Sequence, residues 1–294
     1  MTGGRGFAGV HLLETLREHD AELIAPSRAE LDLLDADAVA RFVERTEPTA
    51  IVHLAGFCSP WLSWGTPGQV LNDNLKMTLN LLEAARKADP PPAVVLVGSG
   101  QVYGRAASLP IDESASLAPS NPYAVSKAAC DLLGGQYELA FGLPVVRLRP
   151  FNHAGPGQTD EYVVSSLCRQ VAEAEVAGQS EALVETGDVS ARRDFTDVRD
   201  VVRAYVSAIE AEPGVYNVCS GRAVPVSRLV ELVQELARVP VRHEIADSRR
   251  RSNEPSELRG SHERMTAATG WRPEIGLEQT VGDTLAWWRA RLAS

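Results

Sequence analysis

Short apolar runs alternate along the chain with longer segments in which apolar residues recur every three to four positions. The runs are rich in β-branched residues and apolar on both faces, which predicts buried parallel strands. They cover residues 22–27, 50–56, 93–100 and 144–150. The intervening segments 35–46, 71–88 and 123–142 have the apolar spacing of helices. Strands that alternate with helices predict βαβ units, and therefore an α/β fold with a doubly wound parallel sheet.

The alternation loosens after Pro150. Helical spacing returns at 197–211 and 226–239, and an apolar run at 215–221 predicts another strand. The polar segment 249–261 is predicted as a loop.

A glycine-rich stretch, TGGRGFAG, covers residues 2–9. Gly3, Gly6 and Gly9 give the pattern GxxGxxG, in which a tight turn lets the backbone approach a pyrophosphate at a helix N-terminus. Glycine triplets also occur by chance, and a flexible N-terminus is the alternative. The helical pattern and the apolar run that follow favour a dinucleotide site, with Phe7 among its residues.

A strand normally precedes this fingerprint, but only Met1 precedes it here. That strand would lie in the middle of the sheet, and without it the neighbouring strands would have unpaired backbone groups. We therefore expect the first strand of the Rossmann sheet to be missing because the recorded start is too late or the chain is truncated.

The end of the predicted second strand distinguishes between the two nicotinamide cofactors. An Asp or Glu there would bind the ribose 2′-hydroxyl of NAD, but the sequence has PSRAE. Ser27 and Arg28 suit a 2′-phosphate, so NADP(H) is preferred and NAD(H) is possible; a solvated loop arginine is the alternative for Arg28. Asp32 and Leu33 are expected beside the adenine.

Tyr123 and Lys127 lie one helical turn apart in NPYAVSK, with Asn121 as a helix cap and Pro122 in the first turn. A free tyrosine has a pKa near ~10, and a neighbouring ammonium favours the phenolate. Tyr123 could then exchange a proton with a substrate hydroxyl or carbonyl, while Lys127 also holds the nicotinamide ribose. Ser99, at the end of a predicted strand, would orient the reacting oxygen. The alternative is a core tyrosine beside a surface lysine.

Ser99, Tyr123 and Lys127, joined to the glycine loop, resemble the extended short-chain dehydrogenase/reductase family, which includes NAD-dependent epimerases and dehydratases. Other matching stretches are HLAG, NLLEAA, GSGQVYG, PYAVSK, RPFNHAGPGQ, RRDFTDVRD, YNVCSG and GWRP. The resemblance therefore covers essentially the whole chain.

The resemblance implies two parts and a partner. The NAD(P)-binding Rossmann domain would take residues 1–150, with 194–220 returning to it. A smaller C-terminal lobe, 151–193 and 221–294, would hold a nucleotide-diphosphate sugar. It also implies a homodimer, in which the two long helices of each subunit form a four-helix bundle.

Cofactor contacts follow from the same resemblance. Ala55 and Gly56 would lie beside the pyrophosphate, and Asn74 would face the site from its helix. Pro150 and His153 would flank the nicotinamide. A helix-surface asparagine and a loop histidine without a role are the alternatives for Asn74 and His153.

Gln101 bears on the reaction type. Dehydratases of the family carry a carboxylate two residues after the Ser or Thr, where it removes the C5 proton of the sugar. An amide has no comparable basic site, so Gln101 argues against dehydration and is expected to hydrogen-bond the sugar. VVRLRPFNHAGPGQ, RRDFTDVRDVVRAY and VYNVCSG most resemble members that reduce GDP-4-keto-6-deoxy-D-mannose to GDP-D-rhamnose with NAD(P)H. A 4-epimerase, a 4,6-dehydratase and a catalytically impaired binding homologue are the alternatives.

Substrate contacts are also implied by the resemblance. Arg193 and Arg251 match arginines that hold the diphosphate, for which arginine forks are suited. Asn152 matches an asparagine that donates to the phosphates, and Glu254 matches an acid at the nucleotide ribose. A solvated basic loop is the alternative for 248–255.

Composition narrows the function classes. The chain has 294 residues and a net charge of −10, which disfavours nucleic-acid binding. It contains no apolar run of about 20 residues and no secretory signal pattern, so we expect a cytoplasmic protein without a membrane partner. Its cysteines are scattered without metal-binding spacing, which predicts free thiols and no metal site. They are Cys58, Cys130, Cys168 and Cys219.

Overall fold

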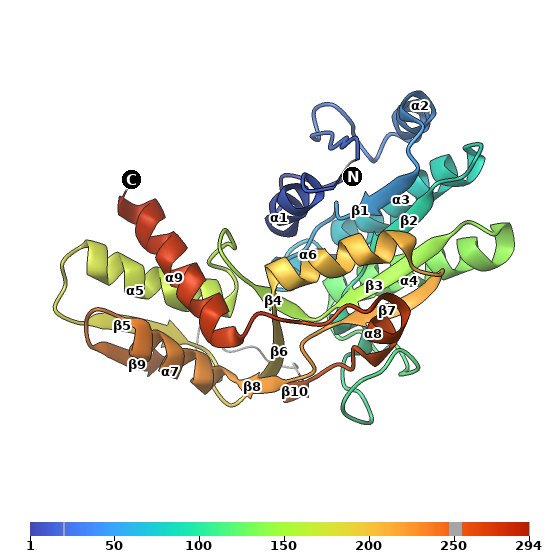
Figure 1. The fold of residues 1–294 in the computed structure, drawn as a ribbon. Helices are drawn as coiled ribbons and strands as arrows, with labels where there is room; N and C mark the ends of the chain where they lie inside the picture. The colour runs from blue at the N-terminus through green and yellow to red at the C-terminus, as the bar shows by residue number, and fades with distance from the viewer. Residues whose placement is uncertain (20, 247–254, 294) are drawn as a thin grey trace.

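The computed structural model describes residues 1–19, 21–246 and 255–293. Four parallel strands form its main sheet in the order β1-β2-β3-β7 (Figure 1). They are β1 (Ala50–His53), β2 (Ala93–Val97), β3 (Val145–Pro150) and β7 (Gly214–Val218). Helices cover both faces of this sheet, which confirms the predicted doubly wound α/β fold.

Successive side chains of the strands alternate between the two faces. On one face, Val52 and Val95 pack with apolar residues of α1 (Phe7–Leu16) and α6 (Val198–Ser207). On the other face, Ile51 and its neighbours pack with α2 (Ala36–Thr46), α3 (Pro67–Lys87) and α4 (Pro122–Phe141). The strands are apolar on both sides because both sides are covered.

The prediction of a strand at 22–27 is wrong. Within the described residues, one hydrogen bond joins this segment to the chain beside β1, from the Met1 amine to the Ile24 carbonyl at 2.6 Å, and the Ser27 carbonyl accepts only from the turn that follows it, from the Glu30 and Leu31 amides. Thr2 forms an isolated parallel bridge with His53 of β1. Met1 and Thr2 thus lie between β1 and 22–27, and a single bond does not make the repeated pairing of a ladder.

Smaller sheets follow β3 in the chain. One has the order β10-β6-β4 with β8 paired to β6, and the other pairs β5 with β9. Their strands are β4 (Asn152–Ala154), β5 (Ala182–Thr186), β6 (Arg192–Asp197), β8 (Ala223–Pro225), β9 (Val241–Ile245) and β10 (Glu257–Leu258). β10 lies inside 249–261, where a loop was predicted. Residues 249–254 of that segment lie outside the described residues.

Three helices lie with the β5-β9 pair at the end of the molecule away from α3 and α4 (Figure 1). They are α5 (Val163–Val176), α7 (Val226–Leu236) and α9 (Leu277–Ala293), and they share one apolar core. The short helix α8 (Glu263–Thr269) packs instead beside β7. The domain boundaries given above remain a prediction. No described helix is both long and apolar enough to cross a bilayer.

The start of α4 follows directly from the sequence. Asn121 accepts a hydrogen bond from the Ala124 amide at 2.8 Å, and Pro122 occupies the first helical position. The helix ends at Gly142, whose φ of +66° is left-handed. The predicted cap is confirmed, and it fixes the turn that carries Tyr123.

Candidate active site

The glycine loop is compact because its glycines leave no room for side chains. A Cβ at Gly3 would lie 2.7 Å from the Ala55 nitrogen, and Gly3 has a φ of +75°. A Cβ at Gly9 would lie 2.2 Å from the Gly3 carbonyl oxygen. The Gly6 amide donates to that same carbonyl at 3.0 Å and precedes α1. This cradle at a helix N-terminus fits the pyrophosphate of a dinucleotide.

Gly56 and Asn74 lie where the segment after β1 contacts α4, the helix that carries Tyr123 and Lys127. The Asn74 Oδ1 accepts from the Phe57 amide at 2.8 Å, and its Nδ2 donates to the Ser126 hydroxyl of α4 at 2.9 Å. Asn74 is buried, so the helix-surface alternative is excluded. A Cβ at Gly56 would lie 3.0 Å from the Asn74 Oδ1 and 3.8 Å from the Lys127 Nζ.

Ser99, Tyr123 and Lys127 converge at the carboxyl ends of β2 and β3, where ligands gather in open α/β sheets. The Ser99 hydroxyl hydrogen-bonds the Tyr123 phenol. The Lys127 Nζ donates to the Val97 carbonyl of β2 at 2.9 Å. Both Tyr123 and Lys127 are buried, which excludes the alternative of a surface lysine.

Burial dominates the electrostatics of the site. It raises the pKa of Tyr123 well above its usual value, and the hydrogen bond from Ser99 lowers it by less. Burial also lowers the pKa of Lys127. The spacing predicted that Lys127 favours the phenolate, but desolvation has the largest effect on the pKa of the phenol. Tyr123 is therefore protonated at neutral pH and can act as an acid.

Gln101 and Asn121 are hydrogen-bonded to each other, and Gln101 also contacts Ser99. Gln101 follows Ser99 in the short helix after β2, and its backbone amide donates to the Ser99 hydroxyl at 3.2 Å. The Asn121 Nδ2 donates to the Gln101 Oε1 at 3.1 Å. Sequence reasoning assigned Asn121 only to the helix cap.

Pro150, Asn152 and His153 lie where β3 passes into β4. The His153 ring stacks on Phe7 of the glycine loop, with centroids 5.9 Å apart and an interplanar angle of 4°. Its Nδ1 lies 3.2 Å from the Phe151 carbonyl. The structure thus places His153 against the glycine loop, where its ring is held by the stack on Phe7. A role beside the nicotinamide remains a prediction.

The residues predicted to bind the adenosine end of the cofactor are more exposed than Tyr123 and Lys127, with the exception of Leu33. Arg28 and Asp32 are exposed, whereas Leu33 is buried in the core beneath α2. The Glu30 carboxylate accepts from the Ser27 amide at 2.7 Å. This amide is therefore already paired with an acid of the same turn.

The predicted substrate residues are only partly described. Arg193 is buried in β6 and donates from Nη1 to the Arg192 carbonyl at 2.9 Å. Asn152, in β4, pairs with Phe195 of β6. Arg251 and Glu254 lie outside the described residues.

Tyr162 and Cys58 are residues of the site that the sequence did not indicate. The Tyr162 hydroxyl donates to the Cys58 carbonyl at 3.1 Å, which joins the residue before α5 to the segment after β1. Burial, followed by nearby Cys58 and Tyr123, raises the pKa of Tyr162. No local motif marks Tyr162, because its contact spans more than 100 residues of sequence.

Comparison with known families agrees with this geometry. The model of the NAD dependent epimerase/dehydratase family matches residues 1–219. The chain belongs to this family. The resemblance stated from the sequence is thereby confirmed.

Two individual relatives of this family are a reductase and an epimerase of nucleotide sugars. The chain is 38% identical to the GDP-6-deoxy-D-mannose reductase of Pseudomonas aeruginosa, over 99% of this chain and 97% of the relative. It is 29% identical to a UDP-glucose 4-epimerase of Corynebacterium glutamicum, over 93% and 90% of the two chains.

Solved structures with a similar fold include the same two kinds of protein. The structure of RMD from Pseudomonas aeruginosa complexed with NADPH has a TM-score of 0.87 and 35% identity, with 98% of this chain and 97% of that chain covered. The UDP-glucose 4-epimerase of Thermus thermophilus, in complex with NAD, has a TM-score of 0.84 and 27% identity over 98% and 97% of the two chains.

Proposed function

We propose that this protein is an NAD(P)H-dependent oxidoreductase that reduces the 4-keto group of a GDP-4-keto-6-deoxyhexose, as a GDP-6-deoxy-D-mannose reductase does. The observation that carries the proposal is the buried set of Ser99, Tyr123 and Lys127 with Gln101 beside it. The set supplies an acid, and the amide supplies no carboxylate for dehydration. The 38% identity to the Pseudomonas reductase supports the same substrate.

Residues of the chain have separate roles in this reaction. The glycine cradle, Ala55 and Gly56 would hold the cofactor, which supplies a hydride when bound. Tyr123 gives its phenolic proton to the C4 oxygen as that oxygen gains charge. Ser99 donates to the same oxygen and orients it. The positive charge of Lys127 stabilises the phenolate left on Tyr123 after the transfer.

The substrate would be held mainly by the C-terminal lobe, 151–193 and 221–294. We assign its diphosphate to Arg193 and Arg251, and its remaining contacts to Asn152 and Glu254. A protein with a net charge of −10 needs such local cations to bind two phosphates.

Cofactor preference is proposed to be NADP(H), with NAD(H) possible. Arg28 is exposed at the turn that would face the ribose 2′-position, and the related Pseudomonas structure contains NADPH. The free thiols suit a reducing compartment, so we place the protein in the cytoplasm.

The experiment compares the wild type with Tyr123→Phe. NADPH absorbance is followed with GDP-4-keto-6-deoxy-D-mannose. We expect oxidation by the wild type only when the sugar is present, and loss of at least 100-fold in kcat for the variant, in the range of general acid catalysis of about 10²–10⁴. NADPH and product binding should be retained. A wild type that oxidises no NADPH above background would refute the proposed function.

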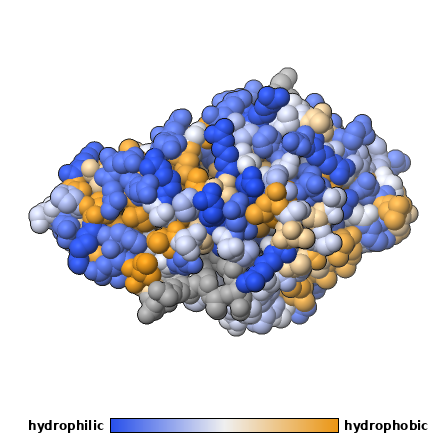
Figure 2. Space-filling model, turned by 90° about the horizontal axis from the view of Figure 1, so that it is seen from below, coloured by the Kyte–Doolittle hydropathy of each residue, from blue (hydrophilic) through white to orange (hydrophobic). Residues whose placement is uncertain are grey.

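We also propose a homodimer through α3 and α4. Val125, Leu132 and Leu139 of α4 are exposed and recur every seven residues, so they form one apolar stripe. Leu79 of α3 and Phe141 of α4 are exposed as well. Apolar side chains lie on the surface at the right-hand end of Figure 2, the end at which α3 and α4 lie in Figure 1, and they also lie at the opposite end.

Mass measurement in solution tests this interface. Leu132, 63% exposed, is replaced by Lys, and Leu183, 41% exposed on β5, is replaced by Lys as the control. We expect a monomer only for the Leu132 variant, because its charge would be buried against the partner. A monomeric wild type would rule out the dimer.

A further inference from the structure

The hydrogen bonds around Asn121 determine which way its side-chain amide faces. Its Oδ1 accepts from the Ala124 backbone amide, which is a donor that cannot change roles. Its Nδ2 is therefore the group that faces Gln101. That nitrogen can only donate, so the Gln101 atom at 3.1 Å is the carbonyl oxygen Oε1.

The orientation of Gln101 follows from that of Asn121. With Oε1 engaged, the two N–H groups of Gln101 Nε2 remain, and within the described part of the chain they have no protein acceptor. Gln101 is half-buried, and its backbone is bonded to the Ser99 hydroxyl that serves Tyr123. The free donors therefore lie beside the reacting groups.

We propose that Asn121 is a positioning residue that turns the Gln101 amide, so that its N–H groups donate to a neutral sugar oxygen next to the reacting carbonyl. The identity of that sugar rests on the proposed function. The helix N-terminus dictates the orientation of Asn121, and Asn121 dictates that of Gln101. Asn121 thus caps α4 through its Oδ1 and orients Gln101 through its Nδ2.

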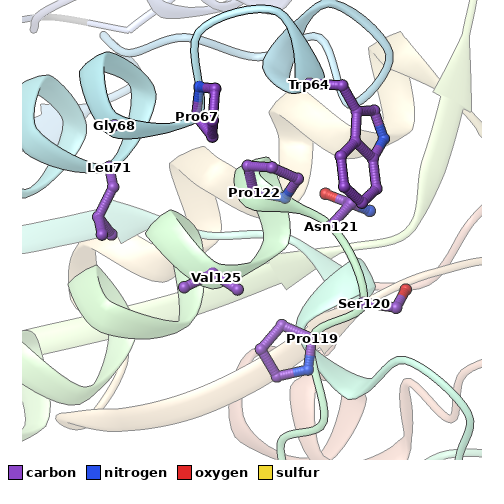
Figure 3. Close-up of a pocket in the computed structure, with 9 residues that line it drawn as sticks. All are labelled: Trp64, Pro67, Gly68, Leu71, Pro119, Ser120, Asn121, Pro122 and Val125. Carbon is purple, nitrogen blue, oxygen red and sulfur yellow. The ribbon is translucent and has the colours of Figure 1, made fainter.

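The place of Asn121 agrees with this role. It stands at the first turn of α4, two residues before Tyr123, and borders an open groove of mostly apolar lining. The Trp64 ring lies beside it there (Figure 3). The asparagine is half-buried, so a change that keeps the cap can be made without repacking the core.

Two variants separate the cap from the positioning role. Asn, Asp and Ser are about equally good caps, so Asn121→Ser and Asn121→Asp both keep the bond to Ala124. The serine removes the donor to Gln101. The aspartate replaces it with an acceptor, so the Gln101 amide turns over and presents its oxygen to the sugar. Gln179→Glu, an exposed site near the end of α5, is the control for added charge.

Kinetics with GDP-4-keto-6-deoxy-D-mannose give the first readout. A single neutral hydrogen bond corresponds to about 2- to 13-fold in affinity. We expect KM to rise about 3-fold for Asn121→Ser and about 10-fold or more for Asn121→Asp, with kcat, thermal stability and NADPH affinity near wild type. Gln179→Glu should match the wild type. Unchanged KM in both Asn121 variants would overturn the proposal.

A double-variant comparison tests whether Asn121 acts through Gln101. In a Gln101→Ala background, Asn121→Asp should have no further effect on KM. If it raises KM as much as it does in the wild type, Asn121 acts by another route and the positioning role is wrong.

A spectroscopic readout is independent of turnover. With glutamine-selective ¹⁵N labelling, the side-chain amide protons of Gln101 should shift downfield in Asn121→Asp, because they then donate to a carboxylate. An unshifted resonance would overturn the proposed orientation even if the wild type is active. A shifted resonance in a protein that does not reduce the sugar would support the orientation and refute the proposed function.

Discussion

Gly9→Ala is the sharpest test of how the glycine loop binds its cofactor. The added Cβ would lie 2.2 Å from the Gly3 oxygen and 2.9 Å from the Gly4 carbonyl carbon, whereas ordinary contact begins at 3.4 Å. Both neighbours are backbone atoms of the loop, so no flexible side chain can move aside. The loop must open by more than an ångström at its narrowest point.

The size of the effect follows from what the loop donates. A hydrogen bond to a charged group contributes about 1.5–3 kcal/mol. Displacing one amide from the pyrophosphate should therefore weaken NADPH binding by about 10- to 100-fold. Overpacking of this kind also costs about 1–3 kcal/mol of unfolding free energy, which leaves a folded protein for the measurement.

Calorimetric titration with NADPH is the assay, and Gly282→Ala is the matched control. Gly282 lies in α9, where the nearest atom to an added Cβ is 4.0 Å away. Alanine there should raise the unfolding free energy by about 0.5–1 kcal/mol and leave NADPH affinity unchanged. A folded Gly9→Ala protein that binds NADPH as the wild type does would refute this account of the loop.

Three further predictions concern selectivity and stability. Arg28→Ala should weaken NADPH about tenfold and NADH by less than twofold, since only NADPH carries the 2′-phosphate; equal effects in calorimetry would remove the case for NADP. Burial lowers the pKa of His53 to about 3, so the unfolded state takes up a proton below its usual pKa of 6.5 while the folded state does not. The wild type should then lose about 2 kcal/mol of unfolding free energy between pH 7.5 and pH 5, and this loss should be absent in His53→Asn when both are followed by urea denaturation. Asp131→Ala leaves the buried Arg149 guanidinium without its bidentate partner, and denaturation should show a loss of about 3–5 kcal/mol.

Features encoded by a few neighbouring residues were predictable from the sequence. The cap of α4 needs only Asn121 and Pro122, and the helix began where they predicted. β2 and β3 are apolar runs with a strand on each side. The segment 22–27 has similar apolar content but forms no strand. A strand needs a neighbouring strand to pair with, and the apolar content of a segment does not show whether that neighbour is present.

Features that join distant segments were not predictable in this way. The bond from Tyr162 to Cys58 connects residues more than 100 positions apart in the chain. The pairing of β5 with β9 spans more than 50 residues. Neither has a periodic or motif signal, because each depends on how the chain returns on itself.

The protonation state of Tyr123 is the clearest case in which burial changed a chemical conclusion. The spacing to Lys127 was predicted, and from it a more acidic phenol. The structure places the phenol in the interior, where loss of water outweighs the Ser99 hydrogen bond and raises its pKa. A protonated phenol is what the reduction of a ketone requires, since the developing alkoxide must receive a proton. The same burial that contradicts the expected phenolate therefore supplies the protonated acid that reduction of the ketone uses at neutral pH.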